Sequence, residues 1–332
     1  MSFNIVVSSA GRRVALLRLF RRALRDLGHR GQVIATDMSP LSSAAHEAER
    51  FFQVPPCTDP GFVPAMLDVC ARTGARLLVP TIDPELAVYA RHRERFAEVG
   101  TTVAVSGPQV VGIGADKRET HAWLTRAGIP TVRQGTVDEV LADPDDWPFP
   151  LMVKPRQGSA GVGVEAVADP DDLKLASCDG DPVVQTVARG REHTIDMLVD
   201  RTGGCVCAVP RRRIEVRAGE SSKGVTVRCP VLEATARRVC AALPDAYGAL
   251  NLQLFRDAGT GETSVIELNP RFGGGFPLSW EAGGRFPEWM ISELLGREPV
   301  TSPSGWRGGV VMLRYDDAVF VDARTVGLPD AV

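Results

Sequence analysis

The chain switches after its first third from alternating strand and helix patterns to a succession of strands, and this switch constrains its fold most. In the first part, short apolar runs alternate with segments whose apolar residues recur at helical spacing. The expected strands are 4–9, 32–37, 75–81 and 101–106, and the expected helices are 13–27, 61–73 and 84–99. Such alternation produces a parallel, doubly wound sheet. We therefore predict a Rossmann-like N-terminal domain, residues 1–110.

The remainder is predicted to form two further subdomains. Residues 111–182 contain a helix at 117–127, a strand ending at Lys154, a glycine-rich loop and a second strand. Residues 183–332 contain a series of strand-like segments interrupted by helices at about 231–243 and 287–295. Consecutive strands predict an antiparallel sheet with helical cover. The expected fold class is α/β followed by α+β.

Composition narrows the classes of partner and the compartment. The net charge of −3 over 332 residues gives no field that would attract nucleic acid or an anionic membrane, and no apolar run is long enough for a bilayer span. Seven scattered cysteines, without a CxxC pair, favour free thiols over disulfides or a zinc site. We expect a cytoplasmic protein without nucleic-acid or membrane partners.

The first strand–helix turn argues against a bound dinucleotide. It reads SSAGRRV (8–14) and lacks the GxGxxG glycines that let a pyrophosphate approach the backbone. Asp37 does end the second strand, where an acid could bind a ribose, but the glycine pattern is missing. A scaffold without a dinucleotide is the favoured interpretation.

The stretch VKPRQGSAGVGV (153–164) places a lysine and several small residues at one turn. Lys154 ends a strand, and Gly158, Ser159, Gly161 and Gly163 follow it. Glycines let backbone N–H groups approach phosphate oxygens. A dinucleotide fingerprint should open a helix, whereas VGVEAV is β-patterned, and no GK[ST] completes a Walker A loop. A phosphate-binding hairpin and a plain mobile hairpin both remain open from this stretch alone.

A second stretch, VIELNPRFGGG (265–275), carries polar residues on one face of an apolar strand. Glu267, Asn269 and Arg271 alternate with apolar residues, and Gln253 lies on a strand expected to be its neighbour. Carboxylate and amide oxygens are ligands that Mg²⁺ accepts alongside nucleotide phosphates, and an arginine can bind a phosphate bidentately. A single buried salt bridge would explain Glu267 and Arg271 only.

Together these motifs resemble the ATP-grasp superfamily. The residues that carry the resemblance are ADK (115–117), VKPRQGSAGVGV, VVQTVARGREHTIDM (183–197), NLQLF (251–255) and VIELNPRFGGG. The similarity runs from about residue 75 to 280 and is greatest to the branch that contains the large chain of carbamoyl phosphate synthetase and its single-module relatives. It implies an ATP-grasp fold, with residues 1–110 as the pre-ATP-grasp domain.

The resemblance also implies roles for individual residues. Lys117 and Lys154 would hold the phosphates, with 158–163 as a lid, and Gln185 to Ala188 (Val187 among them) would line the adenine. Many members have a glutamate where Gln185 stands. Glu192 would bind the ribose, and Arg271 would be the catalytic residue that stabilises the transferred phosphoryl group. The expected ligands of Mg²⁺ or Mn²⁺ are Gln253, Glu267 and Asn269.

The acceptor site is expected in VPRRRIEVRAGESSKG (209–224). On a regular strand, Arg211, Arg213, Glu215 and Arg217 share one face, and arginines recognise carboxylates well. Glu220 lies in the following turn, and SWEAGG, with Ser279 and Glu281, is expected to line the same pocket. A solvated, charged edge strand is the alternative.

The function implied by the resemblance is an ATP- and Mg²⁺-dependent carboxylate–amine ligase. ATP would activate a small-molecule carboxylate as an acyl phosphate, and an amine would then displace phosphate. An ATP-grasp phosphotransferase, a carboxylase and a non-catalytic nucleotide-binding regulator are the alternatives. With one ATP-grasp module and no glutaminase segment in the sequence, carbamoyl phosphate synthesis itself is not expected. Family habit suggests a homodimer.

Overall fold

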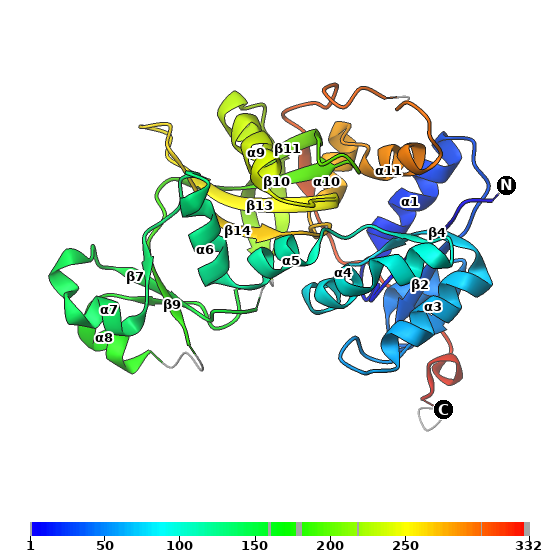
Figure 1. Ribbon diagram of the computed structural model, residues 1–332, viewed down its shortest axis with the longest axis horizontal. Helices are drawn as coiled ribbons and strands as arrows, with labels where there is room; N and C mark the ends of the chain where they lie inside the picture. The colour runs from blue at the N-terminus through cyan, green and yellow to red at the C-terminus, as the bar shows by residue number, and fades with distance from the viewer. Residues whose placement is uncertain (1, 159–160, 177–180, 218, 300, 329–332) are drawn as a thin grey trace.

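The structure is a computed structural model of the 332-residue chain. It describes all residues except 1, 159–160, 177–180, 218, 300 and 329–332, so the predicted site residue Ser159 lies outside the described residues. The N-terminal unit, blue and cyan in Figure 1, lies at one end of the long axis. A small green subdomain lies at the other end, and a large twisted sheet lies between them.

The N-terminal unit is the predicted parallel sheet with helical cover. Its strand order is β3-β2-β1-β4-β5, and every pairing is parallel. The strands are β1 (Asn4–Val7), β2 (Val33–Asp37), β3 (Arg50–Gln53), β4 (Ala75–Val79) and β5 (Thr102–Val103). The helices are α1 (Val14–Asp26), α2 (Ser43–Glu47), α3 (Phe62–Thr73), α4 (Asp83–Glu98) and α5 (Pro108–Ala115). The sequence analysis missed β3, a partly exposed edge strand without a clear apolar pattern.

The small subdomain is built on a four-stranded antiparallel sheet, ordered β6-β9-β7-β8. Its elements are β6 (Gln134–Gly135), α7 (Val137–Ala142), the short 3₁₀ helix Pro144–Asp146, β7 (Leu151–Lys154), β8 (Glu165–Val167), α8 (Pro170–Leu175) and β9 (Val183–Thr186). The glycine-rich loop connects β7 and β8, as predicted. β9 pairs with β7, so this sheet extends past the predicted boundary at residue 182.

The large subdomain contains a six-stranded antiparallel sheet, ordered β14-β13-β10-β11-β12-β15. The strands are β10 (Arg191–Val199), β11 (Cys205–Arg217), β12 (Glu220–Thr226), β13 (Gly248–Arg256), β14 (Thr263–Asn269) and β15 (Val311–Leu313). Its helices are α9 (Pro230–Ala242), α10 (Phe276–Ala282) and α11 (Phe286–Leu294), followed by a 3₁₀ turn at Ala323–Val326. Helix α6 (Lys117–Arg126) also packs on β14, although its sequence lies in the predicted middle subdomain.

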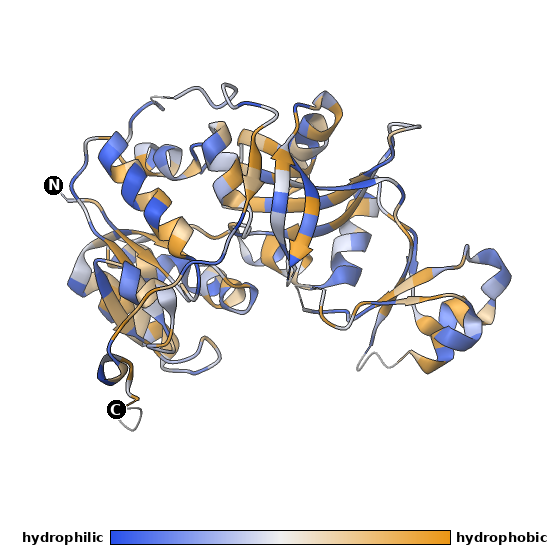
Figure 2. Cartoon of the chain, turned by 180° about the vertical axis from the view of Figure 1, so that it is seen from behind, coloured by the Kyte–Doolittle hydropathy of each residue, from blue (hydrophilic) through white to orange (hydrophobic). Residues whose placement is uncertain are grey.

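One hydrophobic core joins the N-terminal unit to the large subdomain. Phe20 of α1 makes an edge contact with Phe272, with ring centroids 5.8 Å apart, and the same cluster contains Trp280 and Phe286. Figure 2 shows the N-terminal strands as mostly hydrophobic and the surrounding helices as two-faced. Burying each such aromatic side chain contributes about 1.5–3 kcal/mol, so this core fixes the two units against each other.

Two compositional expectations can be compared with the structure. No helix in the described part of the chain is long and apolar enough to span a bilayer. The six cysteines that the structure describes are all free thiols, as expected, and Cys205 and Cys207 both lie on β11.

Candidate functional site

A cavity of about 460 Å³ lies where the small subdomain meets the large sheet, and we call it the hinge cavity. Its lining includes the hinge segment 185–188, which follows β9, and strand residues from both sheets. Most of the residues predicted to bind a nucleotide line it, namely Lys117, Lys154, Gly158, Gly161, Gln185, Val187, Ala188 and Glu192. Residues more than 70 positions apart in the sequence therefore meet around one space.

Lys154 ends β7 and reaches across to the hinge strand. Its Nζ donates a hydrogen bond to Oε1 of Gln185 at 2.8 Å, and Nε2 of Gln185 donates to Oε1 of Gln134 at 2.8 Å. Burial lowers the pKa of Lys154, although the nearby carboxylate of Glu267 acts in the opposite direction. The side chain of Gln185, expected to face an adenine, thus accepts a hydrogen bond from Lys154.

The glycine-rich loop has backbone conformations that require glycine. Gly158, Gly161 and Gly163 have φ values of +103°, +73° and +70°, a region that residues with a Cβ rarely adopt. Lys117 Nζ donates to the carbonyl oxygen of Gly158 at 3.1 Å, which ties the loop to the start of α6. Gly163 is not among the residues that line the hinge cavity; a Cβ there would lie 2.8 Å from the ring of Pro155.

The predicted metal ligands converge on one patch of the large sheet. Gln253 on β13 lies opposite Glu267 on β14, and Nδ2 of Asn269 donates to Oε1 of Glu267 at 3.0 Å. A β-bulge follows this pair, because Leu254 pairs with Val265 and leaves Ile266 unpaired. Ile266 consequently lines the hinge cavity instead of joining the core. Glu267, Asn269 and Gln253 therefore lie on one polar patch, and their binding of a metal stays a prediction.

A second, adjoining cavity of about 250 Å³ is lined by five arginines, and we call it the arginine cavity. The arginines are Arg12, Arg13, Arg211, Arg213 and Arg271. The remaining lining comes from residues 81–84 of the N-terminal unit and from Thr194, Gly219, Glu220, Ser221, Asn251, Gln253, Glu267, Asn269 and Gly273 to Gly275. Both cavities share Arg213, Gly219, Gln253 and Glu267, so a molecule in one would adjoin a molecule in the other.

Arg213 lies at the junction of the two cavities. Its Nη1 donates to Oε1 of Glu192 at 2.6 Å and to Oε1 of Gln253 at 3.2 Å, and its Nη2 donates to the carbonyl oxygen of Gly219 at 2.9 Å. One guanidinium therefore contacts both the predicted ribose-binding acid and a predicted metal ligand.

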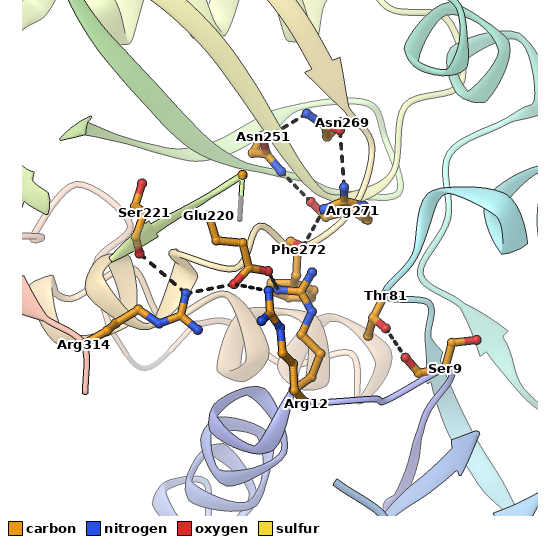
Figure 3. Close-up of polar contacts among 12 residues, drawn as sticks. Ser9, Arg12, Thr81, Glu220, Ser221, Asn251, Asn269, Arg271, Phe272 and Arg314 are labelled. Atoms are coloured by element: carbon orange, nitrogen blue, oxygen red, sulfur yellow. Dashed lines mark hydrogen bonds and ion pairs between the residues drawn. The ribbon is translucent and has the colours of Figure 1, made fainter. Parts of the chain in front are cut away.

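Arg271 is held by an acid from the N-terminal unit. Its Nε and Nη2 donate to the two oxygens of Asp83 at 2.6 and 2.7 Å, and Nη2 lies 3.4 Å from Oδ1 of Asn269. Burial opposes the charge of Arg271, but Asp83 outweighs it and the net effect raises the pKa of Arg271. Figure 3 shows Arg271 beside Asn269 at one end of a polar cluster that extends to Arg12 and Arg314.

Arg211 is a fully desolvated arginine in the wall of the arginine cavity. Nε and Nη2 donate to the carboxylate of Asp196 at 2.6 and 3.0 Å, and the hydroxyl of Ser279 donates to the same carboxylate. Both charged side chains are only 2% exposed. A Cβ on Gly275 would lie 2.4 Å from Nη1 of Arg211, so this guanidinium needs a glycine behind it.

The predicted acceptor face is correct for only part of β11. Arg211 and Arg213 line the arginine cavity, whereas Glu215 and Arg217 do not. Register shifts on either side of Glu215 break the two-residue alternation, so the later side chains no longer follow the earlier ones. Glu215 contacts Lys223 and Ser222, and Arg217 extends into solvent, 3.4 Å from Asp316.

The SWEAGG segment does not line the arginine cavity. Ser279 is completely buried behind it, on the far side of the Arg211–Asp196 pair. Glu281 is exposed on α10 and lies 3.4 Å from Arg22 of α1. The cause is that Phe276–Ala282 forms helix α10, which was not predicted, and this helix directs these side chains away from the cavity.

The contribution of the N-terminal unit to the site was not predicted. Arg12 and Arg13 immediately precede α1, and Asp83 begins α4, so each follows a strand of the parallel sheet. The carboxyl edge of such a sheet is where ligands are bound. That rule, applied to SSAGRRV and to TIDPE (81–85), would have marked these residues.

Two family models match the chain. Residues 5–104 match the N-terminal domain of PylC-like proteins, and residues 180–316 match the model described as ATP-grasp in the biosynthetic pathway with Ter operon. The second match includes the hinge, Glu192, Gln253, Glu267 and Arg271, which meet around the two cavities. The chain belongs to the ATP-grasp superfamily.

Curated relatives of this ATP-grasp chain are distant. The large chain of carbamoyl phosphate synthase from Bifidobacterium animalis is 23% identical over 301 residues, which cover 82% of this chain and 26% of that relative. The D-alanine–D-alanine ligase of Gluconobacter oxydans is 28% identical over 228 residues, covering 60% of this chain and 74% of the ligase. The ATP-grasp chain thus spans about a quarter of the first relative.

Solved structures share the fold of this ATP-grasp chain. The biotin carboxylase domain of 2-oxoglutarate carboxylase from Hydrogenobacter thermophilus, a dimer in complex with MgADP and bicarbonate, superposes with a TM-score of 0.72 at 18% identity. The comparison covers 94% of this chain and 74% of that one. N5-carboxyaminoimidazole ribonucleotide synthetase from Thermotoga maritima gives a TM-score of 0.66 at 17% identity, over 91% and 78% of the two chains. The predicted fold class is confirmed.

Proposed function

We propose that this ATP-grasp chain is an ADP-forming carboxylate–amine ligase that uses ATP and Mg²⁺. One observation carries the proposal: the hinge cavity, with its two lysines, opens onto the arginine cavity through the shared side chains of Gln253 and Glu267. A reaction that transfers a phosphoryl group from ATP to a carboxylate needs two such adjoining spaces, with cations on both sides of the transferred group.

ATP would occupy the hinge cavity. Val187 and Ala188 would contact the adenine, Glu192 would accept hydrogen bonds from the ribose, and Lys117 and Lys154 would bind phosphate oxygens. The glycines of the β7–β8 loop that have positive φ carry no Cβ. A phosphate can therefore approach the backbone N–H groups of this loop closely. Because Lys154 and Arg213 already hold Gln185 and Glu192, ATP would replace internal hydrogen bonds instead of entering an empty polar surface.

The donor set fits a hard divalent cation that shares ligands with phosphates. Among the described residues, no group of three His, Cys, Asp or Glu side chains could hold a metal. Gln253, Glu267 and Asn269 instead offer one carboxylate and two amide oxygens on one patch, and Mg²⁺ commonly takes few protein ligands together with substrate phosphates. When bound, Mg²⁺ would neutralise phosphate charge; Mn²⁺ would accept the same oxygens.

The proposed reaction has two steps. A carboxylate oxygen of the acceptor attacks the γ-phosphorus, the bond to the β-phosphate oxygen breaks, and ADP and an acyl phosphate form. The amine then attacks the acyl carbon and displaces phosphate. Arg271, preorganised by Asp83, would stabilise charge on the transferred group and on the acyl phosphate. Among the described residues that line the two cavities none is a histidine or cysteine, and the proposed steps use no protein nucleophile.

The decisive experiment separates the reaction types by their nucleotide products. Purified protein, MgATP and pools of amino acids and small carboxylic acids would be incubated and resolved by chromatography. Lys154→Ala and Glu267→Gln test the site. Lys174→Ala is the matched control, because Lys174 is exposed on α8, outside the lining of both cavities, and pairs with Asp171 on the same helix at 2.8 Å. Thermal stabilisation by MgATP would be recorded for each variant.

Each outcome identifies one reaction class. Pool-dependent ADP and phosphate, lost in Lys154→Ala and Glu267→Gln but kept in the control, supports the ligase. AMP and pyrophosphate would indicate adenylation and refute the acyl phosphate. ADP formation that depends on bicarbonate would favour a carboxylase. Thermal stabilisation by MgATP without turnover in any pool, kept in Glu267→Gln, would favour the non-catalytic regulator.

We also propose a cytoplasmic location and a homodimer. The location is supported by the free state of the described cysteines, which suits a reducing compartment. The homodimer is proposed by analogy with the biotin carboxylase domain of Hydrogenobacter thermophilus 2-oxoglutarate carboxylase, which is a dimer. Size-exclusion chromatography with light scattering would test the assembly.

A further inference from the structure

The positive charge of the arginine cavity is compensated unevenly. Its lining contains five arginines and three acids, Asp83, Glu220 and Glu267, and two further acids, Asp196 and Glu192, bind Arg211 and Arg213 from outside the lining. Asp83 is bound by both arms of Arg271, and Glu267 belongs to the proposed metal patch. Arginines that line a small, partly closed cavity repel one another unless an anion lies between them. Glu220 faces both Arg12 and Arg13, so this end of the cavity carries excess positive charge and suits an anionic ligand.

Two buried guanidinium nitrogens in this lining have no partner. Among the described residues, Nη1 of Arg211 and Nε of Arg213 are buried without a hydrogen-bond acceptor. Asp196 occupies the other donors of Arg211, and the side chain is 2% exposed, so Nη1 cannot reach bulk water. A buried donor without an acceptor is costly. An oxyanion bound beside Arg211 and Arg213 would supply these acceptors once the lining that covers the two nitrogens shifts, and this marks the position of the first anionic group.

A second basic cluster surrounds Glu220 at the other end of the cavity. Nη1 of Arg314 donates to Glu220 at 2.8 Å, and Arg13 and Arg12 place nitrogens 3.2 and 3.6 Å from the same carboxylate. Figure 3 shows Arg12 and Arg314 reaching this carboxylate from two different segments of the chain. One carboxylate cannot neutralise three guanidinium groups. Burial lowers the pKa of Arg13, Glu220 opposes that effect, and repulsion from Arg271 and Arg12 adds to it.

Glu220 is also held against a glycine. A Cβ on Gly274 would lie 2.1 Å from its carboxyl carbon, so the glycine leaves the space that this carboxylate occupies. The carboxylate is bound by side chains alone, and the structure records no backbone N–H donor to it among the described residues. An internal carboxylate held only by arginines can be replaced by a ligand carboxylate that makes the same contacts.

We propose that the acceptor substrate is a short acid with two anionic groups, and that Glu220 occupies the place of the second group in the ligand-free protein. The reacting carboxylate lies at Arg211 and Arg271, and the second oxyanion lies between Arg13 and Arg314. The volume of about 250 Å³ favours a small molecule. The second oxyanion is a carboxylate or a phosphoryl-type group, since arginine binds both bidentately. This inference builds on the proposed ligase function.

Calorimetric titration tests the proposal, with and without Mg²⁺ and a non-hydrolysable ATP analogue. The probes are straight-chain diacids of three to six carbons, each paired with the monocarboxylic acid and the ω-amino acid of equal length, and with the ω-phosphonocarboxylic acid. We expect at least one dianion to bind about tenfold tighter than its monocarboxylate partner. Glu220→Gln should tighten dianion binding by about tenfold, because the internal competitor is removed.

Two arginine variants give the matched comparison. Arg314→Gln should abolish the preference for dianions, whereas Arg25→Gln, an exposed arginine on α1 outside the lining of the arginine cavity, should keep it. A preference for the diacid or for the phosphonate supports the proposal and identifies the second group. Three results overturn it. In the first no dianion binds, and in the second monocarboxylates bind as tightly as dianions. In the third ω-amino acids bind best and Glu220→Gln abolishes their binding, which would make Glu220 a binding site for an ammonium group.

The same titrations separate failure of this inference from failure of the proposed function. If the ATP analogue binds and dianions show no preference, the ligase proposal stands and the inference falls. If dianions are preferred and the ATP analogue does not bind, the inference stands and the ligase proposal falls.

Discussion

Removing one member of the buried pair of Arg211 and Asp196 should destabilise the large subdomain, and a substitution tests this sharply. Arg211→Met preserves most of the side-chain volume but removes both donors to Asp196, at 2.6 and 3.0 Å. Asp196 is 2% exposed and would keep only the hydroxyl of Ser279 as a partner. An uncompensated buried charge costs about 3–5 kcal/mol, and we expect the lower half of that range because the hydroxyl remains.

The matched control lies on the same strand. Arg217→Met removes an arginine whose partner, Asp316, is 3.4 Å away, with side chains 68% and 96% exposed. Solvent screens such a pair, so the free energy of unfolding should not change measurably. Urea unfolding followed by intrinsic fluorescence, to which the fully buried Trp280 contributes, measures both variants.

A third variant separates the charge from the packing. Replacing the pair together, as Arg211→Met with Asp196→Leu, removes both charges and should recover most of the lost stability, because no charge is left buried. The reasoning is refuted if Arg211→Met and Arg217→Met lower the free energy of unfolding equally. It is also refuted if the double variant is less stable than Arg211→Met alone.

Three further predictions concern the arginine cavity. Asp83→Asn should lower the rate of ADP formation about tenfold, because Arg271 loses its charged partner. The control is Arg93→Gln, which breaks the contact with Asp245 between the same two units and should leave this rate unchanged. Burial raises the pKa of Glu220, but the arginines around it outweigh burial and hold this pKa below the ordinary 4.5. The stabilisation that Glu220 contributes should therefore persist above about pH 5 and decline as the pH falls below 4.5. The difference in unfolding free energy between the wild type and Glu220→Gln should accordingly shrink in acid. Gly274→Ala should displace Glu220 and destabilise by about 1–2 kcal/mol in urea unfolding, whereas Gly112→Ala, with open space around its Cβ, should not destabilise; equal effects would contradict this.

Most of the architecture was predictable because it follows from the local spacing of apolar residues. The parallel N-terminal sheet, the β7–β8 hairpin and the antiparallel large sheet follow from apolar spacing that each segment carries by itself. The convergence of Gln253, Glu267 and Asn269 was also predictable, since side chains on a strand alternate and the two strands are neighbours. The placement of α6 and β9 was less so, because which sheet an element joins depends on contacts far along the chain.

The acceptor side shows where local pattern fails. The alternation rule predicted one face for Arg211, Arg213, Glu215 and Arg217, but irregularities near Glu215 end that face after two arginines. Ser279 and Glu281 do not lie in the site because their segment forms a helix. No spacing in the sequence signals a bulge that depends on the partner strand, or a helix that forms against α1 and β12.

The sequence by itself determined the chemical groups of the nucleotide side, because each motif there carries its residues within one strand or one loop. The tertiary structure alone decided the arginine cavity, whose walls come from the loop before α1, the start of α4, strands β10 to β14 and the loop that follows β14. Arg12, Arg13 and Asp83 are ordinary surface residues when read one segment at a time. They become part of a site only because the core shared by the N-terminal unit and the large subdomain holds the carboxyl edge of the parallel sheet against Arg271 and Glu220.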